Sequence, residues 1–111
     1  MITGSLTENL VYKDDKPAIT VILKTATSKE VRVVMKRKQV MKEHKAPFSI
    51  VVEIFEGVIE FGINGNKRLL KKGDLIALDA HILHDLMCIE DAIIRLSISN
   101  QDAASRVASV I

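Results

Sequence analysis

Short segments in which apolar and β-branched residues alternate with polar ones follow one another from Ala18 to Ser99. Alternation with a period of two places successive side chains on opposite faces of a strand and is typical of half-buried β-structure. The pattern therefore predicts an all-β fold. We expect strands over residues 18–23, 30–35, 38–43, 49–55, 58–63, 67–70, 75–78, 85–89 and 92–99.

Glycine-containing joints between these segments predict tight turns. Asn64-Gly65 is the dipeptide preferred in two-residue type I′ turns, so it predicts a hairpin between the segments on either side. Glu56-Gly57 predicts a second hairpin, in which Gly57 adopts a positive φ. Lys72 to Asp74 predicts a further turn. Eight or more short strands with such turns are typical of a closed barrel or a two-sheet sandwich.

The last twelve residues, 100–111, lack the strand pattern. Asn100 or Asp102 can cap a short helix there, and an unstructured terminus is the alternative. Such a helix would carry three apolar residues on one face: Ala103, Val107 and Val110.

Composition supports one domain over residues 1–111, because 48% of the residues are apolar and a chain of this length can bury a single core. A formal net charge of +2 and an aromatic content of 4% disfavour nucleic-acid binding. No apolar run is long enough to span a membrane. A single cysteine, Cys88, and an N-terminus without an apolar signal segment lead us to expect a cytoplasmic protein.

Two segments between residues 39 and 99 carry histidines at a set distance from a glycine, His44 with Gly57 in the first and His84 with Gly73 in the second, and this spacing resembles that of the cupin family. The first cupin motif is a Gly, five residues, His-x-His, three or four residues, a Glu, six residues and a Gly. The second is a Gly, five residues, Pro-x-Gly, two residues, His, three residues and an Asn. His44 and Gly57 match the first motif, and Gly73 and His84 match the second. The other named positions depart from the motifs and carry Ala46, Ile50, Asp79, His81 and Cys88.

The resemblance implies a jelly-roll β-barrel of two antiparallel sheets. In the family, three histidines and one glutamate hold a divalent transition metal inside the barrel. Here Ala46 and Ile50 stand where the family has two of those ligands, and neither side chain offers a lone pair. His44 and His84 alone would hold a Zn, Fe, Ni or Mn ion only weakly.

We therefore expect a small-molecule-binding barrel with a degenerate metal site, in which His44, His84, Ala46 and Ile50 contact an unassigned ligand. A metal-dependent oxygenase or isomerase that uses His44 and His84 as metal ligands is the alternative, and binding is favoured over catalysis. A ligand-free structural barrel is the third reading.

Val51 and Phe55 lie at the positions of their apolar segment that face out of the barrel, so another surface must cover them. This pattern, together with the resemblance to cupins, leads us to expect a homodimer. The N-terminal segment Leu6 to Tyr12 is a candidate for adding to the partner's barrel.

Overall fold

The computed structural model describes residues 1–99, which form seven β-strands joined by turns and loops and confirm the all-β prediction. The expected C-terminal helix lies outside the described residues. Within the described range, no helix has the length and apolar character needed to cross a membrane. The strands are β1 (Ala18–Lys24), β2 (Ser28–Met35), β3 (Val40–His44), β4 (Ile50–Ile63), β5 (Asn66–Lys71), β6 (Leu75–Leu78) and β7 (His84–Ser99).

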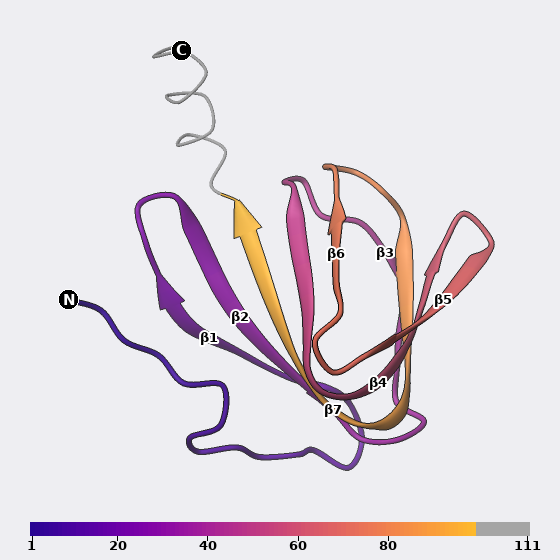
Figure 1. Ribbon diagram of the computed structural model, residues 1–111, viewed down its shortest axis with the longest axis horizontal. Helices are drawn as coiled ribbons and strands as arrows, with labels where there is room; N and C mark the ends of the chain where they lie inside the picture. Colours follow the sequence, from indigo (N-terminus) through magenta and orange to yellow (C-terminus); the bar gives the residue numbers. More distant parts are fainter. Residues whose placement is uncertain (100–111) are drawn as a thin grey trace.

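Two long strands, β4 and β7, bend and take part in both layers of the fold (Figure 1). The first half of β4 pairs with β6 and the second half with β5. The first half of β7 pairs with β3 and the second half with β2, whose other neighbour is β1. All pairings are antiparallel, so one hydrogen-bonded sheet is folded over into the two facing layers of a jelly roll.

The hairpin predicted at Glu56-Gly57 is wrong, because the chain bends there without reversing and residues 50–63 form one strand. Gly57 does adopt a positive φ of 88°. A Cβ at Gly57 would lie 2.2 Å from the carbonyl oxygen of Asp91 and 2.7 Å from Cα of Ala92. The bend of β4 at Gly57 therefore packs closely against β7 at Asp91 and Ala92. The two strands predicted over residues 85–89 and 92–99 also form one continuous strand there, β7. Seven strands therefore replace the eight or more expected.

The turn predicted at Asn64-Gly65 is confirmed. Ile63 pairs with Asn66 across it, and the two turn residues have positive φ values of 53° and 76°. A type I′ turn requires positive φ at both central positions, and Asn and Gly tolerate this best.

The core lies between the inner faces of the two layers. Alternation along β4 is the clearest case, since Ile50, Val52 and Ile54 are buried while Val51 remains 38% exposed. Cys88 lies in this core, and burial raises the pKa of its thiol to about 11. Other buried members come from β2, β4, β5, β6 and β7, and they include Val33, Met35, Ile59, Phe61, Leu70, Leu78, Leu86 and Ile94.

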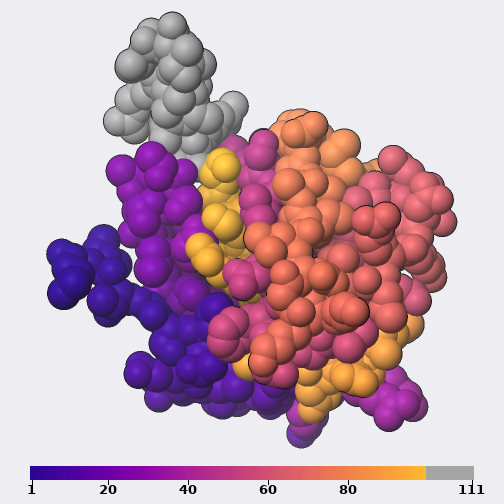
Figure 2. All heavy atoms as spheres, in the orientation of Figure 1, coloured from indigo at the N-terminus to yellow at the C-terminus, as the bar shows by residue number. Residues whose placement is uncertain are grey.

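The N-terminal segment, indigo at the lower left of Figure 2, contacts β2 through Arg32. Arg32 is 6% exposed, and its guanidinium donates hydrogen bonds to the carbonyl oxygens of Ser5, Glu8 and Asn9 at 3.3, 2.9 and 3.4 Å. In the single chain this segment therefore packs against its own sheet.

Candidate functional site

A small cavity between the two layers contains the side chains of His44 and His84. Its volume is about 30 Å³, which is room for one or two water molecules. Apart from the imidazoles, its lining is apolar. Because typical ligand pockets are roughly tenfold larger or more, only an ion or the tip of a larger molecule fits here.

An irregularity in β3 brings His44 to the cavity. Met41 pairs with Leu86, whereas His44 pairs with His84, so three steps along β3 correspond to two steps along β7. A β-bulge of this kind changes the direction of the following side chains. Met41 and His44 consequently both line the cavity, although their spacing would place them on opposite faces of a regular strand.

Both imidazoles are oriented by the same local hydrogen bond. Nδ1 of His44 lies 2.7 Å from the carbonyl oxygen of Lys42, and Nδ1 of His84 lies 2.9 Å from that of Ile82. A carbonyl oxygen can only accept, so each Nδ1 carries the proton and donates it. In the neutral imidazoles the lone pair is therefore on Nε2, the state that can accept a hydrogen bond or bind a metal ion.

The two rings contact each other and one aromatic neighbour. The ring centroids of His44 and His84 are 4.2 Å apart, and Phe61 stacks on His84 at 5.5 Å with an interplanar angle of 6°. His84 is 4% exposed, and burial lowers its pKa below the ordinary value of a histidine. His84 is therefore neutral at neutral pH.

The four predicted site residues are only partly brought together. His44, His84 and Ile50 line the cavity. Ala46 lies in the β3–β4 connection and packs against the core without lining the cavity. His81 is exposed on the β6–β7 loop, has a positive φ of 67°, and donates its backbone N–H to the carbonyl oxygen of Ala46 at 2.8 Å.

Two further cavity residues were missed by the sequence reasoning. Phe61 follows from the strand pairing, since Phe61 pairs with Leu86 and Ile63 with His84, but this register is a tertiary property. Met41 lies three residues before His44, and only the bulge places both on one face. The remaining lining residues are Val33, Val52, Leu86, Ile94 and Leu96.

These donors do not fit the divalent metal site that the cupin resemblance implies. Ile50 stands as an aliphatic side chain in the cavity, and the nearby carboxylates Glu53 and Asp85 belong to the outer faces of their strands. Within residues 1–99, no three His, Cys, Asp or Glu side chains are placed to hold one ion. Zinc and similar ions generally need three or four protein ligands.

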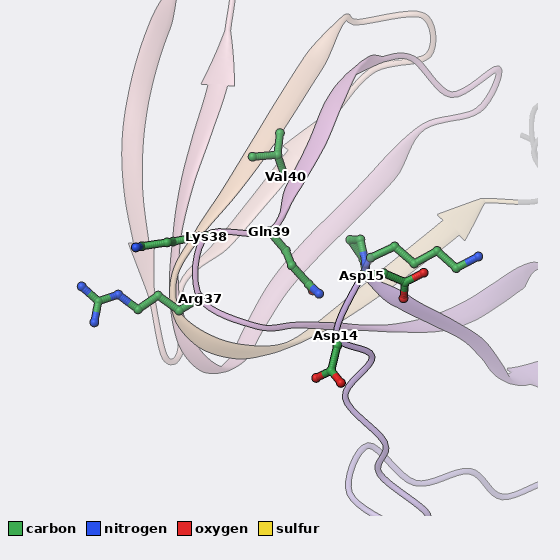
Figure 3. Close-up of a pocket in the computed structure, with 8 residues that line it drawn as sticks. Asp14, Asp15, Arg37, Lys38, Gln39 and Val40 are labelled. Carbon is green, nitrogen blue, oxygen red and sulfur yellow. The ribbon is translucent and has the colours of Figure 1, made fainter.

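A larger and more open hollow of about 420 Å³ lies where the β2–β3 connection meets the segment before β1 (Figure 3). Two of its polar side chains, those of Asp14 and Gln39, are engaged with residues beside the hollow. Lys36, next to the hollow, pairs with Asp14, and the Gln39 side chain donates to the carbonyl oxygen of Lys13 at 2.7 Å. The Arg37 and Lys38 side chains extend away from Asp14 (Figure 3). The histidine cavity is therefore the better candidate site.

Comparisons with known proteins give structural neighbours and no sequence relatives. No family model and no curated protein matches the chain. An RmlC-like cupin protein from Desulfovibrio desulfuricans is 18% identical, with 89% of this chain and 96% of that chain covered and a TM-score of 0.81.

Two other neighbours are similar over most of their lengths. An uncharacterized conserved protein with a double-stranded β-helix domain from Klebsiella pneumoniae is 23% identical, covering 86% of this chain and 85% of that chain, with a TM-score of 0.74. KdgF from Halomonas sp. is 24% identical, covering 83% and 90%, with a TM-score of 0.68. At these identities the likeness shows a shared fold, the cupin jelly roll.

Proposed function

We propose that this chain, a cupin by fold, binds a small ligand through Nε2 of His44 and Nε2 of His84. The observation that carries the proposal is the pair of hydrogen bonds from both Nδ1 atoms to backbone carbonyls. These bonds orient two acceptor lone pairs, neither of which hydrogen-bonds to the described part of the chain. Neither Nε2 is among the fully buried side-chain atoms that lack a partner in the described residues, so water can reach both acceptors, and a ligand that donates to both would replace that water.

The ligand that matches this site is small and presents a hydrogen-bond donor or an electron-pair acceptor. A neutral His84 with a protonated Nδ1 cannot donate from Nε2, which disfavours a carboxylate or phosphate beside that ring. The cavity of about 30 Å³ admits one hydroxyl or one ion. The small volume of the histidine cavity favours binding of a small group over catalysis on a larger substrate.

A ligand-free structural barrel is the alternative, and the small cavity volume favours it. In that case the space beside His84 is a packing defect. The binding hypothesis and the structural-barrel hypothesis predict different effects on probe binding and stability when a larger side chain fills this space. Val33 is 3% exposed and lines the cavity, so Val33→Ile adds one methylene group there.

The test combines histidine NMR with small probes. The Nδ1 and Nε2 resonances of His44 and His84 are recorded while methanol, ethylene glycol and imidazole are titrated into the protein. We expect at least one probe to shift the Nε2 resonances of both histidines, and Val33→Ile to abolish that shift. His81→Ala is the matched control, because its side chain is exposed outside the cavity.

Two outcomes would favour the structural barrel. One is the absence of any Nε2 shift with all three probes. The other is a Val33→Ile variant that gains up to about 0.8 kcal/mol of stability, the value of one buried methylene, without altering any probe response.

A further inference from the structure

A third hollow, which we call the Arg32 hollow, lies between the N-terminal segment and strands β1 and β2. Its volume is about 180 Å³, and its lining includes Arg32 of β2, Lys13 of the N-terminal segment and Thr20 of β1. Arg32 and Lys13 are the ionisable residues of this lining in the described part of the chain, and both are cations. The lining therefore carries positive charge that no lining carboxylate balances.

The charge of Arg32 is buried without a counter-charge. Its side chain belongs to a residue that is 6% exposed, and within residues 1–99 no carboxylate forms an ion pair with it. The guanidinium donates instead to the backbone carbonyl oxygens of Ser5, Glu8 and Asn9, which are dipoles without net charge. Buried charges in proteins are usually paired, because taking an isolated ion out of water is costly. An anion in the hollow would offset that cost.

The hydrogen bonds of Arg32 leave one side of its guanidinium weakly engaged. Nε is the one buried side-chain nitrogen or oxygen of residues 1–99 that has no hydrogen-bond partner. Its neighbour Nη2 donates to the carbonyl oxygen of Asn9 at 3.4 Å, which is longer than the usual range of about 2.7–3.2 Å. Nη1 is better engaged, because it donates to the carbonyl oxygen of Glu8 at 2.9 Å. Nε–H and Nη2–H point in the same direction and form the fork that binds a carboxylate through two parallel hydrogen bonds.

The rest of the lining narrows the class of anion. Four lining residues are apolar: Val11, Ala18, Ile19 and Val34. A phosphate carries oxygens on every side and needs donors around it, whereas a carboxylate is charged at one end and can have an aliphatic chain at the other. A volume of about 180 Å³ corresponds to about six water-sized groups, which is the size of a short-chain acid. The lining therefore favours a short aliphatic carboxylate over a phosphate.

We propose that the Arg32 hollow binds a short aliphatic carboxylate, which accepts hydrogen bonds from Nε–H and Nη2–H of Arg32. Nε is covered in the structure, so the carboxylate reaches this fork by displacing the carbonyl oxygen of Asn9, an exposed residue at the long 3.4 Å bond. The bond from Nη1 to Glu8 keeps the N-terminal segment attached. This site is separate from the histidine cavity, with which it shares no lining residue, and it does not depend on the function proposed for that cavity.

The test is an NMR titration of the full chain with sodium butyrate, followed through the Nε–H resonance of Arg32. Butyramide, which has the same carbon chain without the charge, and inorganic phosphate are titrated at the same ionic strength. We expect butyrate to shift the Nε–H resonance saturably, butyramide to leave it unchanged and phosphate to bind more weakly. The urea midpoint should also rise with butyrate concentration, because a ligand that binds the native state stabilises it.

Three variants make the test specific. Arg32→Lys keeps the charge but removes the fork, and it should weaken butyrate binding by about tenfold or more. Lys13→Gln removes an exposed charge of the lining, and it should weaken binding by at most about fivefold. Lys24→Gln is the matched control, because it changes the net charge equally at an exposed residue of β1 outside the hollow, and it should bind butyrate as the unmodified chain does.

Four results would overturn the inference: an Nε–H resonance that butyrate does not shift, an equal shift with butyramide, phosphate that binds as tightly as butyrate, or equal weakening by Lys13→Gln and Lys24→Gln. Circular dichroism shows whether each variant folds. If Arg32→Lys does not fold, the Nε–H shift of the unmodified chain and the comparison of the two lysine variants decide the question.

Discussion

Replacing Gly57 with alanine should destabilise the fold by about 2–5 kcal/mol. An L-residue at its φ of 88° costs roughly 1–2 kcal/mol. The added Cβ would lie 2.2 Å from the carbonyl oxygen of Asp91, and forcing extra atoms into a packed site typically costs about 1–3 kcal/mol. Since natural domains are stable by only about 5–15 kcal/mol, such a loss would be large.

Gly65→Ala is the matched control, because Gly65 has a similar φ of 76° and a Cβ there would meet nothing within 4 Å. It should show the backbone cost alone, about 1–2 kcal/mol. Urea unfolding, followed by far-UV circular dichroism, measures both variants, and the midpoint shift multiplied by the m-value gives each loss. If Gly57→Ala loses no more stability than Gly65→Ala, the nesting of the two bends does not stabilise the fold as argued.

Three other predictions follow from buried groups and exposed surfaces. Cys88, with a pKa of about 11, should react slowly with iodoacetamide at pH 8 and rapidly in urea; fast labelling of the native chain would contradict this. Burial alone would raise the pKa of Glu30, but hydrogen bonds from Ser97, Ser28 and Arg95 lower it. Its ionised form therefore adds stability above the unfolded pKa of roughly 4.3, and that stability is lost as pH falls through the lower folded pKa. At pH 7, Glu30→Gln should therefore unfold at a lower urea concentration than the unmodified chain, and this difference should shrink below about pH 4. A difference between the two midpoints that does not change with pH would refute the assignment. The apolar outer surface that includes Val51 and Leu75 should pair with a second copy of the chain. Light scattering at micromolar concentration should then give twice the chain mass of 12.3 kDa, and the mass of a monomer would reject the dimer.

Local signals in the sequence predicted the features whose causes are local. The Asn64-Gly65 turn was predicted correctly, because its backbone conformation is set by the turn residues themselves. The buried face of β4 over residues 50–54 was also predicted correctly, because successive side chains of a strand point to opposite faces whatever the rest of the fold does. The positive φ of Gly57 was also predicted correctly. Whether such a glycine reverses the strand or bends it depends on Asp91 and Ala92, which are far away in sequence.

The histidine pair followed from motif spacing, and the rest of the site did not. His44 and His84 are paired across β3 and β7, as the cupin resemblance implied. Met41 was missed because parity counting assumes a regular strand, and the bulge before His44 changes the parity. Phe61 was missed because its stacking on His84 depends on the register of β4 against β7. Ala46 was expected to contact the ligand, yet it lies outside the cavity lining.

The position of β7 has a consequence for how the chain folds as it is synthesised. β7 pairs with β2, β3 and β4, and it is the last strand of the described chain. Until residues 84–99 have left the ribosome, those three strands lack their common partner and expose unpaired edges. Folding must then wait for contacts between distant parts of the chain, which form slowly and leave the nascent protein open to aggregation. A chain truncated before His84 should be a substrate for chaperones and proteases rather than a smaller barrel.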